Sequence, residues 1–239
     1  MRVLGVGAHP DDLEILAGGT LARYVREGHE VVMCHMTTGN AGSIEIPAAE
    51  LVGIRSGEAR RAAEIAGAEY RALGLGDGTI DASSPDQKLL VVDLIREVRP
   101  NVIITHYPDD YMRDHNETAS LVWDCAFLSA LKNFESSREY YPEFVPIYHM
   151  DTIGGLHFDP AEFVDVTDVI DVKVAMLSAH ESQVGYYEDN DPDKPLFDLV
   201  DNMKALTRLR GVQCGVDWAE GFIQCTTWAR PVPHRLLPP

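Results

Sequence analysis

The chain is poor in cysteine and in positive charge, and both shortages narrow the classes of protein to which it can belong. None of its four cysteines forms a CxxC pair or has zinc-finger spacing, so we expect neither a disulfide framework nor a cysteine-based metal site. Against 38 Asp and Glu residues there are only 20 Lys and Arg residues, which gives a formal net charge of -18. Such a surface repels phosphate backbones and anionic lipids, so we expect neither nucleic-acid nor membrane binding.

Signals for targeting and for internal repetition are also lacking. No apolar run is long enough to span a bilayer. The first residues, "MRVLGVGAHPDD", do not resemble a signal peptide, because their apolar stretch is short and runs directly into acidic residues. We therefore expect a soluble, cytoplasmic protein. Without repeats, linkers or low-complexity segments, residues 1–239 are expected to form a single domain.

Short apolar runs alternate with helical patterns over the first 131 residues. Strands are expected at 2–8, 29–39, 68–78 and 101–108, and helices at 13–28, 47–67, 87–100 and 114–131. The strand segments are continuously apolar, which is typical of strands buried on both faces. This alternation predicts an α/β fold that is Rossmann-like, with a mostly parallel sheet and helices on both faces.

The second half of the chain is less regular. Strands are expected at 142–153, 162–167 and 218–228, and helices at 168–180 and 197–215. Residues 185–196, "GYYEDNDPDKPL", form a polar stretch with two prolines and are expected to be a loop. This loop and residues 132–146 are expected to shape a pocket or a subunit contact.

Two of the expected strands run into segments rich in histidine and aspartate. The first strand is followed by "HPDD" at 9–12, and the strand at 101–108 leads into "HYPDDYMRDH" at 106–115. In open parallel sheets, ligands bind beyond the carboxyl ends of the strands, at the point where the strand order reverses. If these two strands are neighbours at that point, the two segments face one another.

The residue types in these segments suit a catalytic zinc site. His9, Asp12 and His115 supply two imidazoles and a carboxylate, which is a three-ligand set that leaves a position open for water. Asp11 is then free to take a proton from that water, while Pro10 stiffens the turn between the two acidic residues and His9.

When "HPDD" is considered alone, helix capping is favoured over metal binding. Asp11 or Asp12 at the start of a helix is a common N-cap, and Asp114 with His115 is compatible with a cap as well. A single histidine is more often a structural residue than a ligand. The coincidence of both clusters at strand ends favours the metal site.

Several segments resemble the LmbE/PIG-L family of zinc-dependent N-acetylglucosamine-type de-N-acetylases. "AHPDDLEILAGGTLA" resembles the signature of the family, and "NVIITHYPDDYMRDHNETA" resembles its second metal-binding segment. "ELVGIRSGEARRAAEIAGAEYRALGLGDG" resembles its arginine-bearing helix, strand and turn, and "AHESQ" at 179–183 resembles an H-x-S-Q element. The resemblance covers residues 1–131 well and the remainder loosely.

The resemblance implies a role for each matching position. His9, Asp12 and His115 are the expected zinc ligands, and Asp11 is the expected general base. Arg55 matches an arginine that holds substrate, although a solvated charge on a helix face would look the same in the sequence.

One position departs from the family pattern. Many members have a histidine three places before the last ligand, where this chain has Met112, whose thioether cannot donate a hydrogen bond or a proton. His180 and His106 are candidates to replace it in contacting the substrate, to polarise the carbonyl or protonate the amine, with the alternatives that His106 is structural and that His180 caps or packs a helix end. Asn40 replaces an acidic residue in the second loop, so we expect it to contact a different sugar substituent.

Two further aspartates, Asp110 and Asp114, are expected to orient His115, since a ligating imidazole usually donates its other N–H to an oxygen. The predicted function is the zinc-dependent removal of an acetyl group from the amide nitrogen of an N-acetylglucosamine-type sugar. An amidase for a sugar–amino-acid conjugate and an inactive small-molecule-binding relative remain alternatives. The resemblance also implies a homo-oligomer.

Overall fold

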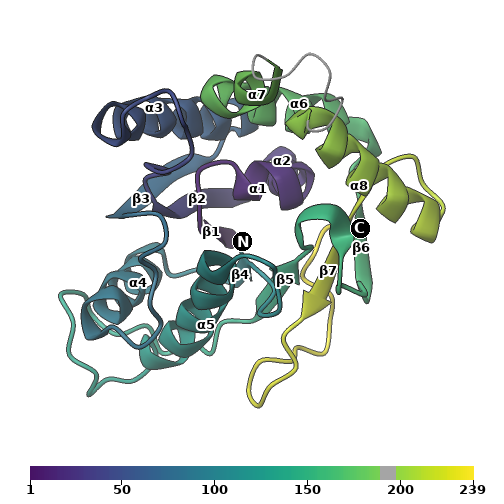
Figure 1. The fold of residues 1–239 in the computed structure, drawn as a ribbon. Helices are drawn as coiled ribbons and strands as arrows, with labels where there is room; N and C mark the ends of the chain where they lie inside the picture. Colours follow the sequence, from purple (N-terminus) through teal and green to yellow (C-terminus); the bar gives the residue numbers. More distant parts are fainter. Residues whose placement is uncertain (189–197) are drawn as a thin grey trace.

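The computed structural model describes residues 1–188 and 198–239, in which one mixed sheet forms the centre of the molecule (Figure 1). Its strands follow the order β3-β2-β1-β4-β5-β7-β6. Their bounds are β1 (Arg2–Gly7), β2 (Glu30–Thr37), β3 (Glu69–Leu75), β4 (Val102–Thr105), β5 (Ile147–Met150), β6 (Glu162–Asp165) and β7 (Ala219–Gln224). The first five strands are mutually parallel, whereas β7 runs antiparallel to both β5 and β6.

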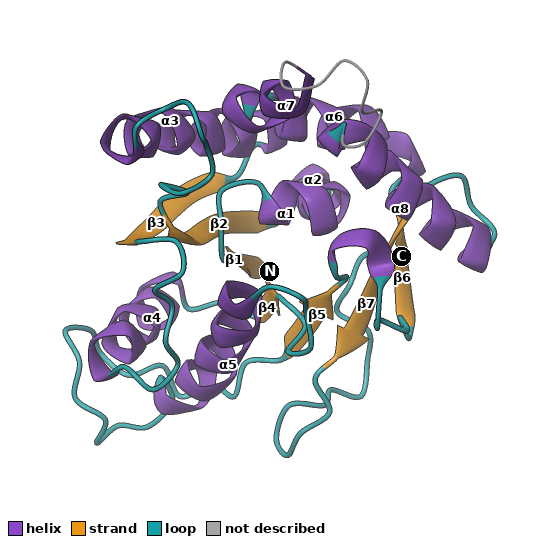
Figure 2. Cartoon of the chain, viewed as in Figure 1, coloured by secondary structure: helices purple, strands orange, loops and turns teal. Residues whose placement is uncertain are grey.

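Helices cover both faces of this sheet (Figure 2). The helices α4 (Pro85–Val98) and α5 (Arg113–Leu128) pack on one face. The other face carries α1 (Asp12–Leu16), α2 (Gly18–Arg26), α3 (Ala48–Ala66), α6 (Ile170–Ser178), α7 (Glu181–Glu188) and α8 (Leu199–Cys214). Two separate apolar clusters fill the space on the two faces. The predicted α/β class, with a mostly parallel sheet and helices on both faces, is therefore confirmed.

The order of strands reverses at β1, which pairs with β2 on one side and β4 on the other. The registers match Val6 with Thr105, so the chain leaves both strands at the same edge of the sheet. The two segments rich in histidine and aspartate therefore meet at this edge. In the described part of the chain, no helix combines the length and apolarity that a membrane crossing requires.

The helix expected at 13–28 is in fact two helices, α1 and α2, that meet at Ala17. The amides of Gly19 and Thr20 donate to the carboxylate of Glu220 over 2.8 and 2.7 Å, which the start of a new helix allows. A Cβ on Gly19 would approach Val166 to 2.7 Å, so this close contact requires glycine. Apolar periodicity continues across the break, which is why the sequence predicted one helix.

Two other elements differ from their expected bounds. The strand expected at 142–153 is limited to β5, because Pro142 and Pro146 lack the amide hydrogens that a strand donates. Residues 185–188 of the expected loop belong to α7, and the rest of that loop lies outside the described residues.

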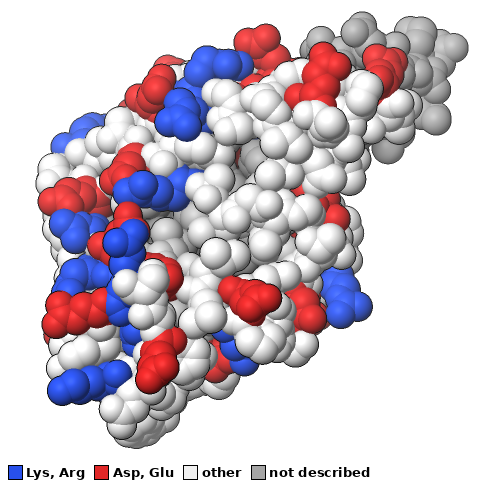
Figure 3. All heavy atoms as spheres, turned by 90° about the vertical axis from the view of Figure 1, so that its left-hand side faces the viewer, with Lys and Arg blue, Asp and Glu red and all other residues white. Residues whose placement is uncertain are grey.

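Charges of both signs lie side by side on the face that carries the β3 edge (Figure 3). Arg71 pairs with Glu69 over 2.6 Å and with Glu97 over 3.3 Å, and Arg138 also pairs with Glu97 over 2.7 Å. Arg71 and Arg138 thus both form ion pairs with neighbouring carboxylates.

Candidate metal centre

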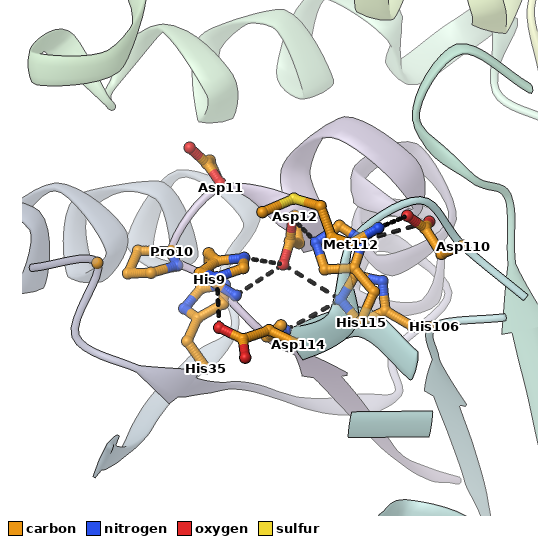
Figure 4. Close-up of polar contacts among 12 residues, drawn as sticks. His9, Pro10, Asp11, Asp12, His35, His106, Asp110, Met112, Asp114 and His115 are labelled. Atoms are coloured by element: carbon orange, nitrogen blue, oxygen red, sulfur yellow. Dashed lines mark hydrogen bonds and ion pairs between the residues drawn. The ribbon is translucent and has the colours of Figure 1, made fainter. Parts of the chain in front are cut away.

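Three side chains from two parts of the chain meet beyond the carboxyl ends of β1 and β4 (Figure 4). His9 and Asp12 come from the turn after β1, and His115 comes from the first turn of α5. Their candidate ligand atoms all lie within 4.8 Å of one another, and all three residues are buried. The Asp12 carboxylate lies between the rings, 3.4 Å from His9 Nδ1 and 3.3 Å from His115 Nε2.

Each of these imidazoles has a second carboxylate near the ring nitrogen that does not face Asp12. Asp114 Oδ2 lies 3.2 Å from His9 Nε2, and Asp110 Oδ2 lies 3.2 Å from His115 Nδ1. Carboxylates in this position fix the orientation of a ligating ring and raise its basicity. Asp110 thus faces His115 as expected, whereas Asp114 supports His9 instead of His115, because its position on α5 turns it toward the first segment.

The donor set fits a divalent cation. Burial lowers the pKa of His9, but Asp114 and Asp12 outweigh this effect and raise the pKa to about 10. Burial also lowers the pKa of His115, while Asp12 and Asp110 raise it to about 9. Among the described residues, neither ring nitrogen of His115 has a hydrogen-bond partner of normal geometry. Two protons therefore offset only part of the negative charge of a buried cluster in which two imidazoles and a carboxylate could hold zinc.

His106 lies behind the three candidate ligands. Its ring stacks on His115 with 3.9 Å between centroids, and its Nε2 accepts the amide hydrogen of Ala8 over 2.9 Å. Burial, with a contribution from His115, lowers the pKa of His106 to about 4, so the ring is neutral. It could complete an alternative group with Asp110 and His115, but it is fully buried and does not line the adjacent cavity.

Asp11 points away from the candidate ligands and lines a cavity of about 430 Å³ (Figure 4). Its φ of 119° lies in the left-handed region, which strains a residue with a side chain and is common where function demands it. Burial raises the pKa of its carboxyl group, against the opposing effect of Arg55. The left-handed turn is what separates the directions of Asp11 and Asp12.

Arg55, from α3, stabilises this turn through hydrogen bonds. Its Nη2 donates to Asp11 Oδ2 over 2.8 Å and to the carbonyl of Pro10, and its Nη1 donates to the carbonyl of Gly39 over 3.3 Å. A Cβ on Gly39 or Gly42 would approach the Arg55 side chain to 2.6 Å, so glycines allow the loop to lie against it. Arg55 lines the cavity, but much of its hydrogen-bonding capacity is used within the chain.

Two predicted substrate contacts lie elsewhere. His180 is fully buried, and its Nε2 lies 3.3 Å from Glu14, so it does not reach the cavity. Asn40 Oδ1 accepts the amide hydrogen of Asp77 over 2.9 Å. Asn40 therefore stabilises the loop and does not line the cavity. Both side chains support the shape of the site from outside it.

The structure adds Glu14, which the sequence did not single out, and shows where the H-x-S-Q segment and Met112 lie. Glu14 lies between His180 and His35, with His35 Nε2 at 3.6 Å. Gln183 lines the cavity and donates to the carbonyl of Gly42 over 3.2 Å. The H-x-S-Q resemblance marked this second segment, but only folding brings it beside the 39–42 loop. Met112 lines the same cavity.

The chain is similar to proteins of known activity. Over 192 residues it is 31% identical to diacetylchitobiose deacetylase of Thermococcus kodakarensis, a match that spans 76% of this chain and 70% of the relative. A solved structure of N,N'-diacetylchitobiose deacetylase from Pyrococcus horikoshii with an inhibitor superimposes with a TM-score of 0.81 and 25% identity, covering 94% of this chain and 83% of that one.

A hydratase has the same fold. The structure of 4-carboxy-2-hydroxymuconate hydratase from Pseudomonas putida matches with a TM-score of 0.82 and 22% identity, over 98% of this chain and 99% of the other. The fold alone therefore does not determine the reaction. The family model for GlcNAc-PI de-N-acetylase matches residues 4–126, which is about half of the chain. On this match and the 31% identity, the chain belongs to the PIG-L family.

Proposed function

We propose that the protein hydrolyses the acetamide of an N-acetylglucosamine-type sugar or its conjugate, releasing acetate and the free amine. The observation that carries the proposal is that Asp11 lines one cavity together with His9 and Asp12, two of the three candidate ligands that meet there with the buried His115. Membership of the PIG-L family and the identity with a diacetylchitobiose deacetylase support the same reaction.

Zinc is the proposed cofactor, held by His9, Asp12 and His115. When bound, the ion supplies Lewis acidity to the amide oxygen and to the attacking water. Asp11 takes the proton of that water and passes it to the nitrogen of the leaving amine. Burial favours this role because it raises the pKa of Asp11, while Arg55 keeps the carboxylate in position.

The cavity suits a neutral sugar whose product is a cation. Asp77 and Asp114 contribute negative charge to its lining, and Tyr111, Ile153 and Leu199 contribute apolar surface. Carboxylates of this kind disfavour an anionic substrate and tolerate an ammonium product. A homo-oligomeric state and a cytoplasmic location stay predictions.

The proposal is tested on the metal-free protein titrated with zinc, with N-acetylglucosamine, N,N'-diacetylchitobiose and an N-acetylglucosaminyl conjugate as substrates. Acetate and free amine are measured separately. We expect equal amounts of both products, dependent on one zinc per chain. Release of amine without acetate, which only a conjugate that carries a second amide can give, would instead favour an amidase for another acyl group, and stoichiometric zinc without either product would favour an inactive binding relative.

Two variants separate the proposed roles. Asp11→Asn should keep zinc bound and lower kcat by about 10²- to 10⁴-fold, which is the usual contribution of a general acid–base group. His115→Ala should lose zinc together with activity. Full activity in Asp11→Asn, or an unchanged zinc content in His115→Ala, would contradict the respective assignment.

A further inference from the structure

A second cavity, of about 560 Å³, shares no lining residue with the cavity at the candidate metal centre. It is lined by Trp123 and Asp124 of α5, by His149 of β5, and by Cys225 and Thr227 after β7. Most of its surface is apolar. None of these residues takes part in the reaction proposed above.

Cys225 and His149 lie on one face of the antiparallel pair β5–β7. The register matches His149 with Ile223 and Tyr148 with Gln224, and the amide of Cys225 donates to the carbonyl of Ile147 over 2.8 Å. Cys225 is therefore two residues beyond the partner of His149, and side chains in that diagonal relation share a face. Both side chains line the cavity while each residue is less than one-tenth exposed.

The surroundings of the pair prepare it for proton transfer. His149 Nδ1 lies 2.7 Å from the carbonyl oxygen of His106, which can only accept, so Nδ1 carries the hydrogen and Nε2 is the acceptor. Trp123 Nε1 donates to Thr227 Oγ1 over 3.2 Å, which leaves the Thr227 hydroxyl free to donate to Cys225 Sγ over 3.3 Å. The Thr227 hydroxyl thus contacts the thiol, and the acceptor Nε2 belongs to a ring that lines the same cavity.

We propose that Cys225 and His149 form a thiol-based modification site that takes small uncharged electrophiles from the apolar cavity. His149 accepts the thiol proton, and the sulfur attacks the electrophilic carbon. With iodoacetamide the sulfur–carbon bond forms as the carbon–iodine bond breaks, iodide leaves, and the proton on His149 passes to solvent. The pairing of a cysteine with an oriented imidazole is the arrangement that activates thiols elsewhere.

The charges around the thiol agree with this assignment. Burial alone raises the pKa of Cys225, but hydrogen bonds with His149 and Thr227 outweigh it and bring the pKa to about 7. Asp124 lies on the cavity wall but is paired with Lys88 of α4 over 2.6 Å, so its charge is compensated within the chain. By contrast, burial raises the pKa of the fully buried Cys34 and Cys125 to about 12.

In the experiment, the full chain is treated with iodoacetamide, and peptide mass spectrometry measures the alkylation rate of each cysteine. An unstructured cysteine peptide in the same solution serves as the reference. At pH 7 a thiol of pKa about 7 is half ionised, whereas a free cysteine of pKa about 8.5 is roughly 3% ionised. Relative to the peptide, the rate at Cys225 should therefore fall about tenfold between pH 7 and pH 9. Parallel pH dependence of Cys225 and the peptide would overturn the proposal.

Two variants show whether the proposed partners activate the thiol. His149→Asn retains an N–H for the His106 carbonyl but provides no base. The alkylation rate of Cys225 should therefore fall about tenfold at pH 7 and change little at pH 9. Thr227→Val, at an exposed position, should lower the alkylation rate of Cys225 about threefold. Unlabelled Cys34 and Cys125, with an unchanged rate at the exposed Cys214, show that each variant is folded. An unchanged Cys225 rate in His149→Asn would remove His149 from the site.

The chemistry of the cavity is tested with a second probe of similar size. Iodoacetate carries a negative charge and should react with Cys225 several-fold more slowly than iodoacetamide, after correction for the same ratio at the peptide. Cys225→Ser should leave acetate release from N,N'-diacetylchitobiose unchanged, which separates this site from the proposed function. Equal corrected rates for the two probes would contradict the preference for uncharged electrophiles.

Discussion

Two regions of the molecule bury carboxylates in opposite ways. Near β7, Glu220 pairs with Lys173, and Asp151 pairs with Arg210 over 2.6 and 3.1 Å, so each buried anion has a permanent cation. At the edge beyond β1 and β4, Asp12 is surrounded by imidazoles, which are cations only when protonated. The first arrangement is complete in the chain itself, whereas the second favours an added cation.

Removal of a permanent cation should have the largest effect on stability. Lys173 Nζ bonds to Glu220 and to the carbonyl of Ile15 over 2.8 Å, and both charged side chains are buried. Lys173→Met leaves Glu220 charged and unpaired, so the free energy of unfolding should fall by about 3–5 kcal/mol. Chemical denaturation measures this change. The double variant Lys173→Met/Glu220→Gln should recover part of the loss, and a neutral single variant would show that the pair is not structural.

Alkaline pH should destabilise the metal-free protein next most strongly. The pKa values of His9 and His115 are raised in the folded state, to about 10 and about 9, from an unfolded value near 6.5. Protonation therefore stabilises the fold fully below pH 6.5, and this contribution is lost as the pH rises through 9 and 10.

Urea denaturation between pH 6.5 and 10 should show a loss of a few kcal/mol in the metal-free protein, less than two independent groups would give because both imidazoles share Asp12. With saturating zinc the loss should be smaller, because the cation replaces the protons, and zinc binding should strengthen as the pH rises. A metal-free protein whose stability is constant over this range would contradict the comparison of the two clusters.

The carboxylates behind the imidazoles should affect metal affinity more modestly. Asp110→Asn removes the acceptor that faces His115 Nδ1 and should weaken zinc binding by about 10- to 100-fold. Competition with a chelating indicator measures the affinity. Asp109→Asn changes the same charge at the exposed neighbouring position and serves as the matched control. Equal effects of the two variants would indicate a general charge effect instead of support for His115.

Arg55 should show the smallest effect of the four. Arg55→Lys keeps the positive charge but cannot reach Asp11, Pro10 and Gly39 together, so kcat should fall about tenfold. If Arg55 mainly positions Asp11, KM should change little. A rise in KM at constant kcat would instead favour the direct substrate contact that the resemblance implies.

Local patterns were sufficient to predict the fold class and the meeting of the two clusters. The apolar runs predicted β1 and β4, and the strand-order rule predicted that residues 9–12 and His115 would lie at one edge of the sheet. The division of the aspartates was not predictable in this way. Asp114 and Asp110 flank the same segment, and only the orientation of α5 directs one to His9 and the other to His115.

The roles of remote partners were also beyond local patterns. His180 was expected to contact substrate, but folding places it against Glu14, about 166 residues away along the chain. The break between α1 and α2 depends on Glu220, which approaches Gly19 from the far end of the sequence. Similarly, Cys225 reads as one of several scattered cysteines until β7 pairs with β5 and brings it beside His149.

The sequence by itself determined which residue types lie at each strand end, because strand and helix periodicity are local properties of the chain. It thereby determined that His9, Asp11 and Asp12 occupy one tight turn, in which Pro10 limits the backbone. The tertiary structure decided which carboxylate faces which imidazole and which cysteine meets a base. Those contacts depend on directions fixed by packing between elements that are distant in sequence, and hydrogen bonds and charge pairing are effective only over a few ångströms.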